Sequence, residues 1–372
     1  MDLGVFTAGM SDGSLGAVCD IAVKNGLKAV EIGVGNYPGS AHCPVDELLA
    51  DSAKAEDWKK IITGKGLKIS ALSCHGNPLH PDLDFARKDV GTTRKTIALA
   101  QMLGVETIVG FSGCPGGGPR DTVPNWITCP WPPDFLTALE WQRSERLDPF
   151  WAIMALRLKK VNKRIAWEMH PGFLVSNTAA LLDACERVES LLAGGIQQDD
   201  EKIERILAWM QSIDALDADE VDWAEKVFTD GVGEVEAKVA AACLGSNFDP
   251  SHLWWQGMDP VISLKTLGRK VFHVHAKDCR IDGPNAALKG VLDTTHYADE
   301  AKRSWIFRTV GYGHSRDTWC DIVSTLRLIG YDGTLSIEHE DSLMSFMEGF
   351  CKAAAFLGAI ILTEDRGKVT WA

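Results

Sequence analysis

Residues 330–341, GYDGTLSIEHED, contain the pattern that decides the fold of this 372-residue chain. GYDG predicts a turn, TLSI predicts a short buried strand, and the strand ends in a run of acids with one histidine. Buried carboxylates are unfavourable unless they are paired, protonated or bound to a cation. The stretch therefore indicates an apolar strand whose end either reaches solvent or surrounds something positive.

The same order of strand, turn and amphipathic helix recurs along the chain. The predicted strands span residues 3–9, 28–35, 68–76, 106–113, 164–172, 244–252, 270–278 and 333–341. Alternating strands and helices predict a parallel sheet, and eight repeats predict its closure into an α/β (β/α)8 TIM barrel. An open doubly wound sheet is the alternative, but FTAGMSDGS after the first strand is not the GxGxxG loop usual in that fold.

Two stretches are longer than the repeat requires. Residues 114–150 are rich in Gly, Pro and Trp, and they predict a long, lid-like loop after the fourth strand. Residues 186–235 are acidic and predict a helical insertion between the fifth and sixth strands, either an oligomer contact or a solvated helix pair. No linker separates two parts, so we expect a single TIM-barrel domain over 1–372, assembled as a homo-oligomer.

The composition narrows the class of partner. A net charge of −13 argues against nucleic acid or an anionic membrane surface, since both require a basic face. The sequence contains no run of about 18 apolar residues, so no membrane-spanning helix is predicted. The N-terminus carries no signal-peptide pattern, and the ten cysteines form no CxxC pair, so we expect a reducing cytoplasm.

Four predicted strands end in a residue able to bind a metal. These are Glu168, Asp249, His275 and Glu338. In a barrel their strand ends are consecutive around half of the rim, so their side chains are expected to converge. His273 shares the inward face with His275, but His275 is nearer the mouth. Two Glu, one Asp and one His suit one divalent ion such as Mn²⁺, Mg²⁺ or Co²⁺ better than a structural zinc.

Other polar residues are predicted near the same rim. His170 follows Glu168 on the inner face, and His252 follows Asp249 by three residues, placed to touch a substrate oxygen. His75 and Glu31 stand at the ends of the third and second strands and are candidate substrate contacts. Tryptophans in the long loop and after His252 either stack on a sugar face or pack a lid.

Taken together, several motifs carry a resemblance. They are WEMHPG (167–172), DPSHL (249–253), HVHAKD (273–278) and the run from Thr309 to Asp341, with its Gly-x-Gly, tryptophan, GYDG and glutamate spacing. At these positions the chain resembles the xylose isomerase-like barrel superfamily, in its sugar phosphate isomerase/epimerase branch. That branch includes ketose 3-epimerases, inosose dehydratases and endonuclease IV. The resemblance covers the barrel but not the two long stretches.

The resemblance implies roles for individual residues. In the epimerases four ligands hold one divalent ion, and two of them, here Glu168 and Glu338, act as catalytic acid and base. His252, in the DxxH element, then contacts the sugar. Arg280 is the candidate for a basic residue that binds a hydroxyl, although its spacing from the strand-seven histidine is one residue shorter than in the epimerases. Lys277 competes for that role.

The predicted chemistry is metal-assisted proton transfer on a small-molecule carbohydrate. A divalent ion stabilises the enediolate formed when a proton leaves the carbon next to a carbonyl, and two carboxylates move the proton. We therefore expect a sugar isomerase or epimerase acting on an unphosphorylated substrate. The alternative is a dehydratase or lyase that eliminates a β-hydroxyl or glycosidic oxygen from a keto-sugar or keto-inositol, with His170, His252 or Lys277 as the acid.

Two further functions are disfavoured. Abasic-site DNA cleavage requires more histidines at the second and third strands and a basic groove, and the acidity of the chain argues against DNA. A sugar-binding or assembly protein that merely keeps the barrel would lack affinity for divalent metal.

Overall fold

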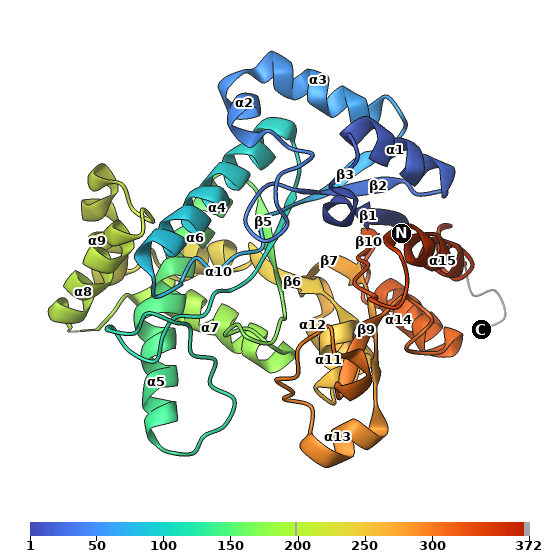
Figure 1. Cartoon of the computed structure of the whole chain (residues 1–372). Coiled ribbons are helices and arrows are strands. Elements are labelled where there is room, and N and C mark those ends of the chain that lie inside the picture. The colour runs from blue at the N-terminus through green and yellow to red at the C-terminus, as the bar shows by residue number, and fades with distance from the viewer. Residues whose placement is uncertain (198, 368–372) are drawn as a thin grey trace.

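The computed structural model describes residues 1–197 and 199–367, and its centre is a closed barrel of parallel strands (Figure 1). The strands follow one another around the barrel in the order β1-β10-β7-β6-β5-β4-β3-β2, and β10 pairs with β1 to close it. They are β1 (Asp2–Phe6), β2 (Ala29–Gly33), β3 (Lys68–Ser73), β4 (Thr107–Gly110), β5 (Arg164–Glu168), β6 (Leu244–Phe248), β7 (Val271–Ala276) and β10 (Thr334–Ile337). The predicted (β/α)8 TIM barrel is confirmed.

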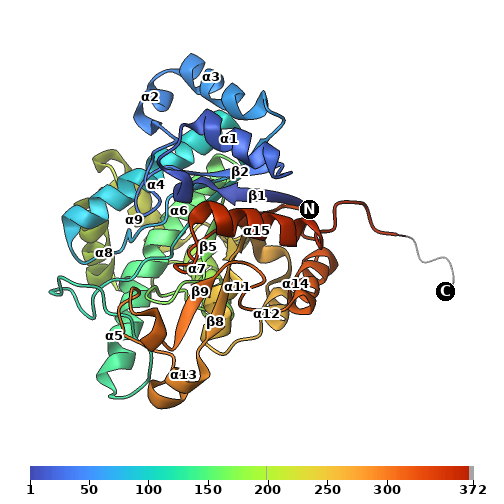
Figure 2. The same ribbon diagram turned by 45° about the vertical axis from the view of Figure 1, so that its right-hand side comes forward.

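Helices surround the barrel (Figures 1 and 2). They include α1 (Leu15–Lys24), α2 (Val45–Ala50), α3 (Ser52–Thr63), α4 (Leu83–Leu103), α6 (Asp148–Lys160), α7 (Thr178–Gly194), α10 (Glu234–Ala241), α11 (Pro250–Trp255), α12 (Pro260–Leu267), α14 (Arg316–Leu328) and α15 (Phe346–Gly358). Strands such as β7 are buried along their whole length, because one face lies inside the barrel and the other packs on helices.

Local sequence fixes where these helices begin and end. The carboxylate of Asp82 accepts hydrogen bonds from the first backbone N–H groups of α4, and Gly104 ends that helix in a left-handed conformation with φ +71°. The hydroxyl of Ser315 caps α14 in the same way. These boundaries set where the chain enters the next strand and hence where each strand end meets the rim.

The long stretch after β4 is only partly a loop. Extended and turn structure ends before α5 (Asp134–Gln142), and a π-helical turn (Arg143–Leu147) then connects α5 to α6. The predicted loop over 114–150 is therefore wrong at its end, which is helical. Pro149 lies in the first turn of α6, where a proline costs no helical hydrogen bond, so this helix tolerates it.

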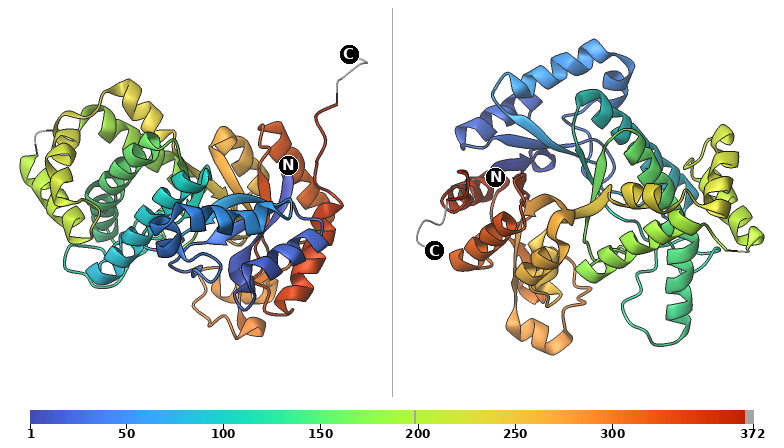
Figure 3. Two further views of the ribbon diagram at one scale, coloured as in Figure 1. Left: turned by 90° about the horizontal axis from the view of Figure 1, so that it is seen from above. Right: turned by 180° about the vertical axis from the view of Figure 1, so that it is seen from behind.

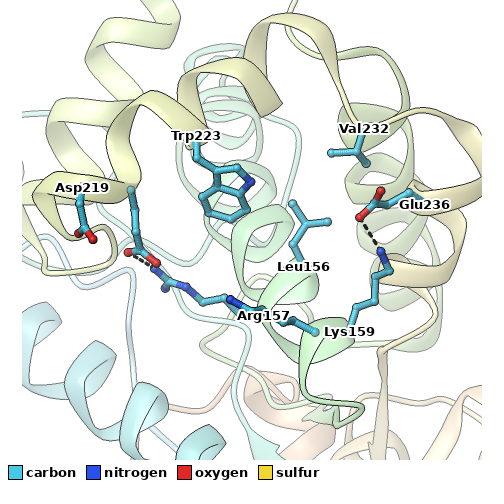
Figure 4. Close-up of a pocket in the computed structure, with 9 residues that line it drawn as sticks. Leu156, Arg157, Lys159, Asp219, Trp223, Val232 and Glu236 are labelled. Atoms are coloured by element: carbon cyan, nitrogen blue, oxygen red, sulfur yellow. Dashed lines mark hydrogen bonds and ion pairs between the residues drawn. The ribbon is translucent and has the colours of Figure 1, made fainter.

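The helical insertion between β5 and β6 is confirmed, with different limits. The first residues of the predicted range continue α7, and the excursion proper contains α8 (Asp200–Ser212) and α9 (Val221–Asp230) before α10 returns to the barrel. Seen from above, α8 and α9 lie at the opposite end of the molecule from α15 (Figure 3). A hollow of about 480 Å³ lies between α6 and this insertion (Figure 4).

A two-stranded excursion follows β7 and has no counterpart among the predicted elements. β8 (Asp278–Ile281) pairs antiparallel with β9 (Trp305–Arg308), and α13 (Gly283–Lys289) lies between them. Figure 2 shows this excursion descending from the barrel to α13. It lies on the same side of the molecule as α5 and the loop before it (Figure 1).

None of the helices in the part of the chain that the structure describes combines the length and the apolar character needed to cross a bilayer.

Candidate metal centre and active site

Four acid and histidine side chains meet at the carboxyl ends of neighbouring strands. Glu168 is the last residue of β5, Asp249 follows β6, His275 lies in β7, and Glu338 follows β10. One ligand atom from each lies within 4.8 Å of the others. The structure thus brings together the four residues that the sequence predicted to converge.

The two carboxylate oxygens of Asp249 have different surroundings. Oδ1 accepts a hydrogen bond from the backbone N–H of Ser251 at 2.8 Å and so caps α11. Oδ2 lies 3.3 Å from Nε2 of His252 and is buried without a hydrogen-bond partner. The DPSH sequence therefore fixes this carboxylate by a helix cap and leaves one oxygen directed at the cluster.

Glu168 is held by several donors. Its Oε2 lies 3.1 Å from His75 Nε2 and accepts a hydrogen bond from Asn247 Nδ2 at 3.0 Å, while its Oε1 lies 3.1 Å from His252 Nε2. Burial favours the neutral carboxyl, but the contacts with His252, His275 and His75 outweigh it and hold the pKa of Glu168 well below its usual value. Glu168 is therefore an ionised carboxylate at neutral pH.

His275 is oriented from the opposite side by Glu31. Its Nδ1 lies 3.0 Å from Glu168 Oε2 and 3.2 Å from Glu338 Oε2, and its Nε2 lies 2.9 Å from Glu31 Oε1. Glu31, on β2, is fully buried and also lies 2.8 Å from His273 Nε2. Burial opposes its ionisation, but the two histidines hold the pKa of Glu31 well below its usual value. Glu31 thus positions His275 instead of lying where a substrate would meet it.

Lys277 places an ammonium group among the acids. Its Nζ lies 3.0 Å from Asp249 Oδ2, 2.7 Å from Glu338 Oε2 and 3.1 Å from Glu340 Oε2. Burial favours the neutral amine, but these acids together raise the pKa of Lys277 well above its usual value. Lys277 is therefore protonated, and one ammonium is shared among three carboxylates.

Two of the three acids next to Lys277, Asp249 and Glu338, ionise differently. Burial, reinforced by the negative charges of Glu168 and Glu338, raises the pKa of Asp249 to about 6 despite the ammonium. Burial also acts on Glu338, but Lys277 and His275 outweigh it and lower the pKa of Glu338 to about 2. Burial opposes protonation of His275, but Glu31 and Glu338 raise the pKa of His275 well above its usual value, so His275 as well as Lys277 supplies positive charge beside these carboxylates.

Three polar atoms of the cluster have no hydrogen-bond partner among the residues that the structure describes. They are Asp249 Oδ2, His275 Nδ1 and Glu338 Oε2. Lys277 and Glu168 are near them, but not in hydrogen-bond geometry. Buried polar atoms without partners are costly, and this donor set suits a hard or borderline divalent ion. The buried cluster is consistent with a divalent metal site, and its residues fit the ion.

A hollow of about 180 Å³ opens over the cluster. Its lining includes His75, Glu168, His170, Lys277 and Glu338. His252 contacts the same glutamate from the side. Arg280 does not line this hollow, because it lies on β8 opposite Ile306 of β9, and its side chain is exposed. Of the two basic residues proposed to bind a hydroxyl, the structure places Lys277 at the site and Arg280 away from it.

Two aromatic residues at the mouth were not singled out from the sequence. Tyr37 and Phe111 line the hollow from the segments after β2 and β4. The Phe111 ring lies 4.7 Å from that of His75 and 4.9 Å from that of His170, measured between ring centroids. Both residues lie at or directly after the ends of predicted strands, and the sites of TIM barrels are built at those strand ends. Their position in the sequence could therefore have identified them as residues of the site.

The sequence match to a known family spans most of the chain. The model of the Xylose isomerase-like TIM barrel family matches residues 19–195 and 229–357. The unmatched gap lies within the insertion that contains α8 and α9. A protein from Bacillus subtilis (strain 168), named Uncharacterized protein YfiH, is 31% identical over 330 residues, which cover 88% of each chain.

Solved structures share the fold. The probable 3-DHS dehydratase AsbF, involved in petrobactin synthesis in Bacillus anthracis, matches with a TM-score of 0.55 and 15% identity over 96% of this chain and 99% of that one. A D-tagatose 3-epimerase-like protein matches with a TM-score of 0.51 and 16% identity over 97% and 98%. At these identities the likeness concerns the fold alone. By its sequence match, this chain belongs to the Xylose isomerase-like TIM barrel family.

Proposed function

We propose that this protein is a divalent-metal-dependent sugar isomerase or epimerase that moves a proton at a carbon next to a carbonyl. One observation carries the proposal: four ligand atoms converge, and three of them are buried without a hydrogen-bond partner. Membership of the family and the shared fold of a D-tagatose 3-epimerase-like protein support it. The proposed ligands are Glu168, Asp249, His275 and Glu338.

The chain's own residues supply proton transfer and positioning. A divalent ion bound by the four ligands supplies positive charge to the substrate oxygens as the neighbouring carbon loses its proton. Glu168 and Glu338 reach the centre from β5 and β10, and one carboxylate takes the proton while the other returns it. His75 and His252 keep Glu168 ionised and fix its position.

Elimination of a β-hydroxyl or glycosidic oxygen is the second candidate, because it begins with the same loss of a proton. It also requires an acid for the leaving oxygen. His170 donates its Nδ1 proton to the carbonyl of Pro171 at 2.6 Å, so its Nε2 has no proton to give, and Nε2 of His252 engages the β5 glutamate. Lys277 is protonated and lines the hollow of about 180 Å³ over the cluster, so it is the acid that favours this candidate.

The test is incubation of the manganese-loaded protein with a panel of keto-sugars in deuterated water, followed by NMR. Epimers or isomers that contain solvent deuterium would support the first candidate. An unsaturated product would support the second. Absence of exchange from every ketose, with metal bound, would contradict both.

A further inference from the structure

A second hollow of about 370 Å³ lies beside the barrel mouth. His170 lines both this hollow and the smaller one over the metal cluster, which we call the mouth hollow. His252, whose Nε2 contacts Glu168, lines the second hollow too. The two histidine rings lie 4.1 Å apart between centroids, so they form a thin wall between the second hollow and the reacting centre.

Four large aromatic side chains contribute to the lining of the second hollow. Trp126 comes from the loop after β4, Trp255 from α11, and Tyr297 and Trp305 from the excursion after β7. Among the described residues no lysine or arginine lines it, so nothing there would balance a phosphate or carboxylate. Its one acid, Asp293, already accepts hydrogen bonds from backbone N–H groups of the excursion. The lining therefore suits an uncharged ligand with flat faces.

The aromatic wall is rigid before any ligand binds. The rings of Trp255 and Trp305 stack with centroids 4.4 Å apart and planes 7° from parallel. The guanidinium of the buried Arg303 lies 4.1 Å from the Tyr297 ring and 4.7 Å from the Trp305 ring. The indole N–H of Trp305 donates to the carbonyl of Val291 at 3.0 Å. A ligand would therefore lose little affinity to ordering of the wall.

Two buried polar atoms beside this hollow lack partners. The indole Nε1 of Trp255 and the Nδ1 of His252 have no hydrogen-bond partner among the described residues. Both residues line the hollow. Neither atom is exposed to the hollow, so the ring faces and the other polar groups of the lining are what a carbohydrate or an aromatic aglycone would contact.

We infer that the second hollow binds the second ring of a glycoside whose first ring reacts at the mouth hollow. This inference rests on the proposed function, because it extends the substrate of the same site. The mouth hollow alone is smaller than the ~300–1,000 Å³ of usual small-molecule sites, whereas the two hollows together fall within that range. The second ring is either another sugar or an aromatic group, since both offer a flat face to indole.

The experiment measures binding to the metal-loaded protein by calorimetry. The probes are glucose, cellobiose, maltose, lactose and phenyl β-D-glucoside. At least one two-ring probe should bind about ten-fold more tightly than glucose. Trp126→Ala and Tyr297→Ala should each weaken that probe by about 2- to 10-fold, the range expected for one ring contact. A preference for a disaccharide identifies a second sugar, and a preference for the phenyl glucoside identifies an aromatic aglycone.

The matched control is Trp131→Ala. Trp131 lies in the same loop as Trp126, is 75% exposed and does not line the hollow, so its removal should leave all affinities unchanged. Equal affinity for glucose and every two-ring probe would overturn the inference, as would equal effects of the Trp126 and Trp131 substitutions. Failure of the proposed function would instead appear as absent deuterium exchange from the ketoses, which the binding measurements do not use.

Discussion

The barrel mouth and the hollow of about 480 Å³ between α6 and the insertion, here called the insertion hollow, both bring acids and bases together. They differ in how the charges are matched. In the insertion hollow two cations lie beside acids one to one: Arg157 pairs with Glu220 and Lys159 with Glu236 (Figure 4). At the mouth several carboxylates share one ammonium, and three polar atoms have no hydrogen-bond partner. The larger hollow is the electrostatically satisfied one.

The difference teaches which charged cluster predicts a ligand. The glutamate side chains of the insertion hollow are 29% and 47% exposed, so water stabilises their charge, whereas that of Glu168 is 3% exposed. Exposed pairs contribute little to stability. Buried, unevenly matched acids persist only where something compensates them. Burial combined with missing partners, and not size or the number of charges, distinguishes the mouth as the proposed functional centre.

The largest expected effect comes from the same substitution made at both places. Glu168→Gln removes a proposed metal ligand and proton carrier, so the rate of deuterium exchange should fall ~10²- to 10⁴-fold. Glu236→Gln in the insertion hollow should leave that rate unchanged. NMR of the exchanged ketose and metal content by mass spectrometry measure the two effects. Equal rates for the two variants would remove the contrast between the regions.

Bound metal should stabilise the protein against unfolding, and only substitutions at the mouth should remove that gain. At a concentration of 100 Kd, Mn²⁺ should stabilise the folded protein by about 2.7 kcal/mol, because it binds the folded state alone. Denaturant unfolding with Mn²⁺ or with a chelator measures this. Asp249→Asn should abolish the gain, and Glu220→Gln should retain it. A gain that survives Asp249→Asn would place the ion elsewhere.

Glu31 offers a sharper test, because it touches no substrate. Glu31→Gln weakens the orientation of His275, and loss of such a partner typically lowers metal affinity about 10- to 100-fold. Titration with Mn²⁺ followed by calorimetry gives the affinity. The exchange rate at saturating Mn²⁺ should recover most of its value, as expected for a positioning residue. A variant with full metal affinity would show that Glu31 is only a core residue.

The smallest effect is expected at the insertion hollow. Arg157→Ala should lower the free energy of unfolding by about 1 kcal/mol or less, since it breaks a partly exposed pair with Glu220. Mn²⁺ affinity should not change. A change in metal affinity in this variant would indicate that the insertion communicates with the mouth.

The sequence predicted the convergence of the four rim residues because each lies at or directly after the end of an apolar strand, and the strands of a barrel follow one another in chain order. It did not predict that Glu31 contacts His275, since β1 and β10 separate their strands and the contact crosses the barrel interior. It misplaced Arg280, because β8 and β9 pair across a long intervening segment that has no hairpin signal. Helix α5 was not predicted, because the Gly- and Pro-rich segment before it led the whole stretch to be taken as a loop.

Other predictions stay open to experiment. The roles of the site residues, the single domain, the homo-oligomer and the cytoplasmic location remain predictions, and each depends on properties outside the barrel geometry.

Because Asp249 caps α11, metal binding at this carboxylate is coupled to the stability of the first turn of that helix. One oxygen of this carboxylate holds the first turn of α11 while the other faces the ion site, and the same helix carries His252 and Trp255. Loss of the ion would free Asp249 to rotate and loosen its cap, so amide hydrogen exchange in α11 should quicken when the site is emptied. The two histidines between the hollows would then be held less firmly, and the metal-free protein would bind the inferred glycoside less selectively than the loaded form.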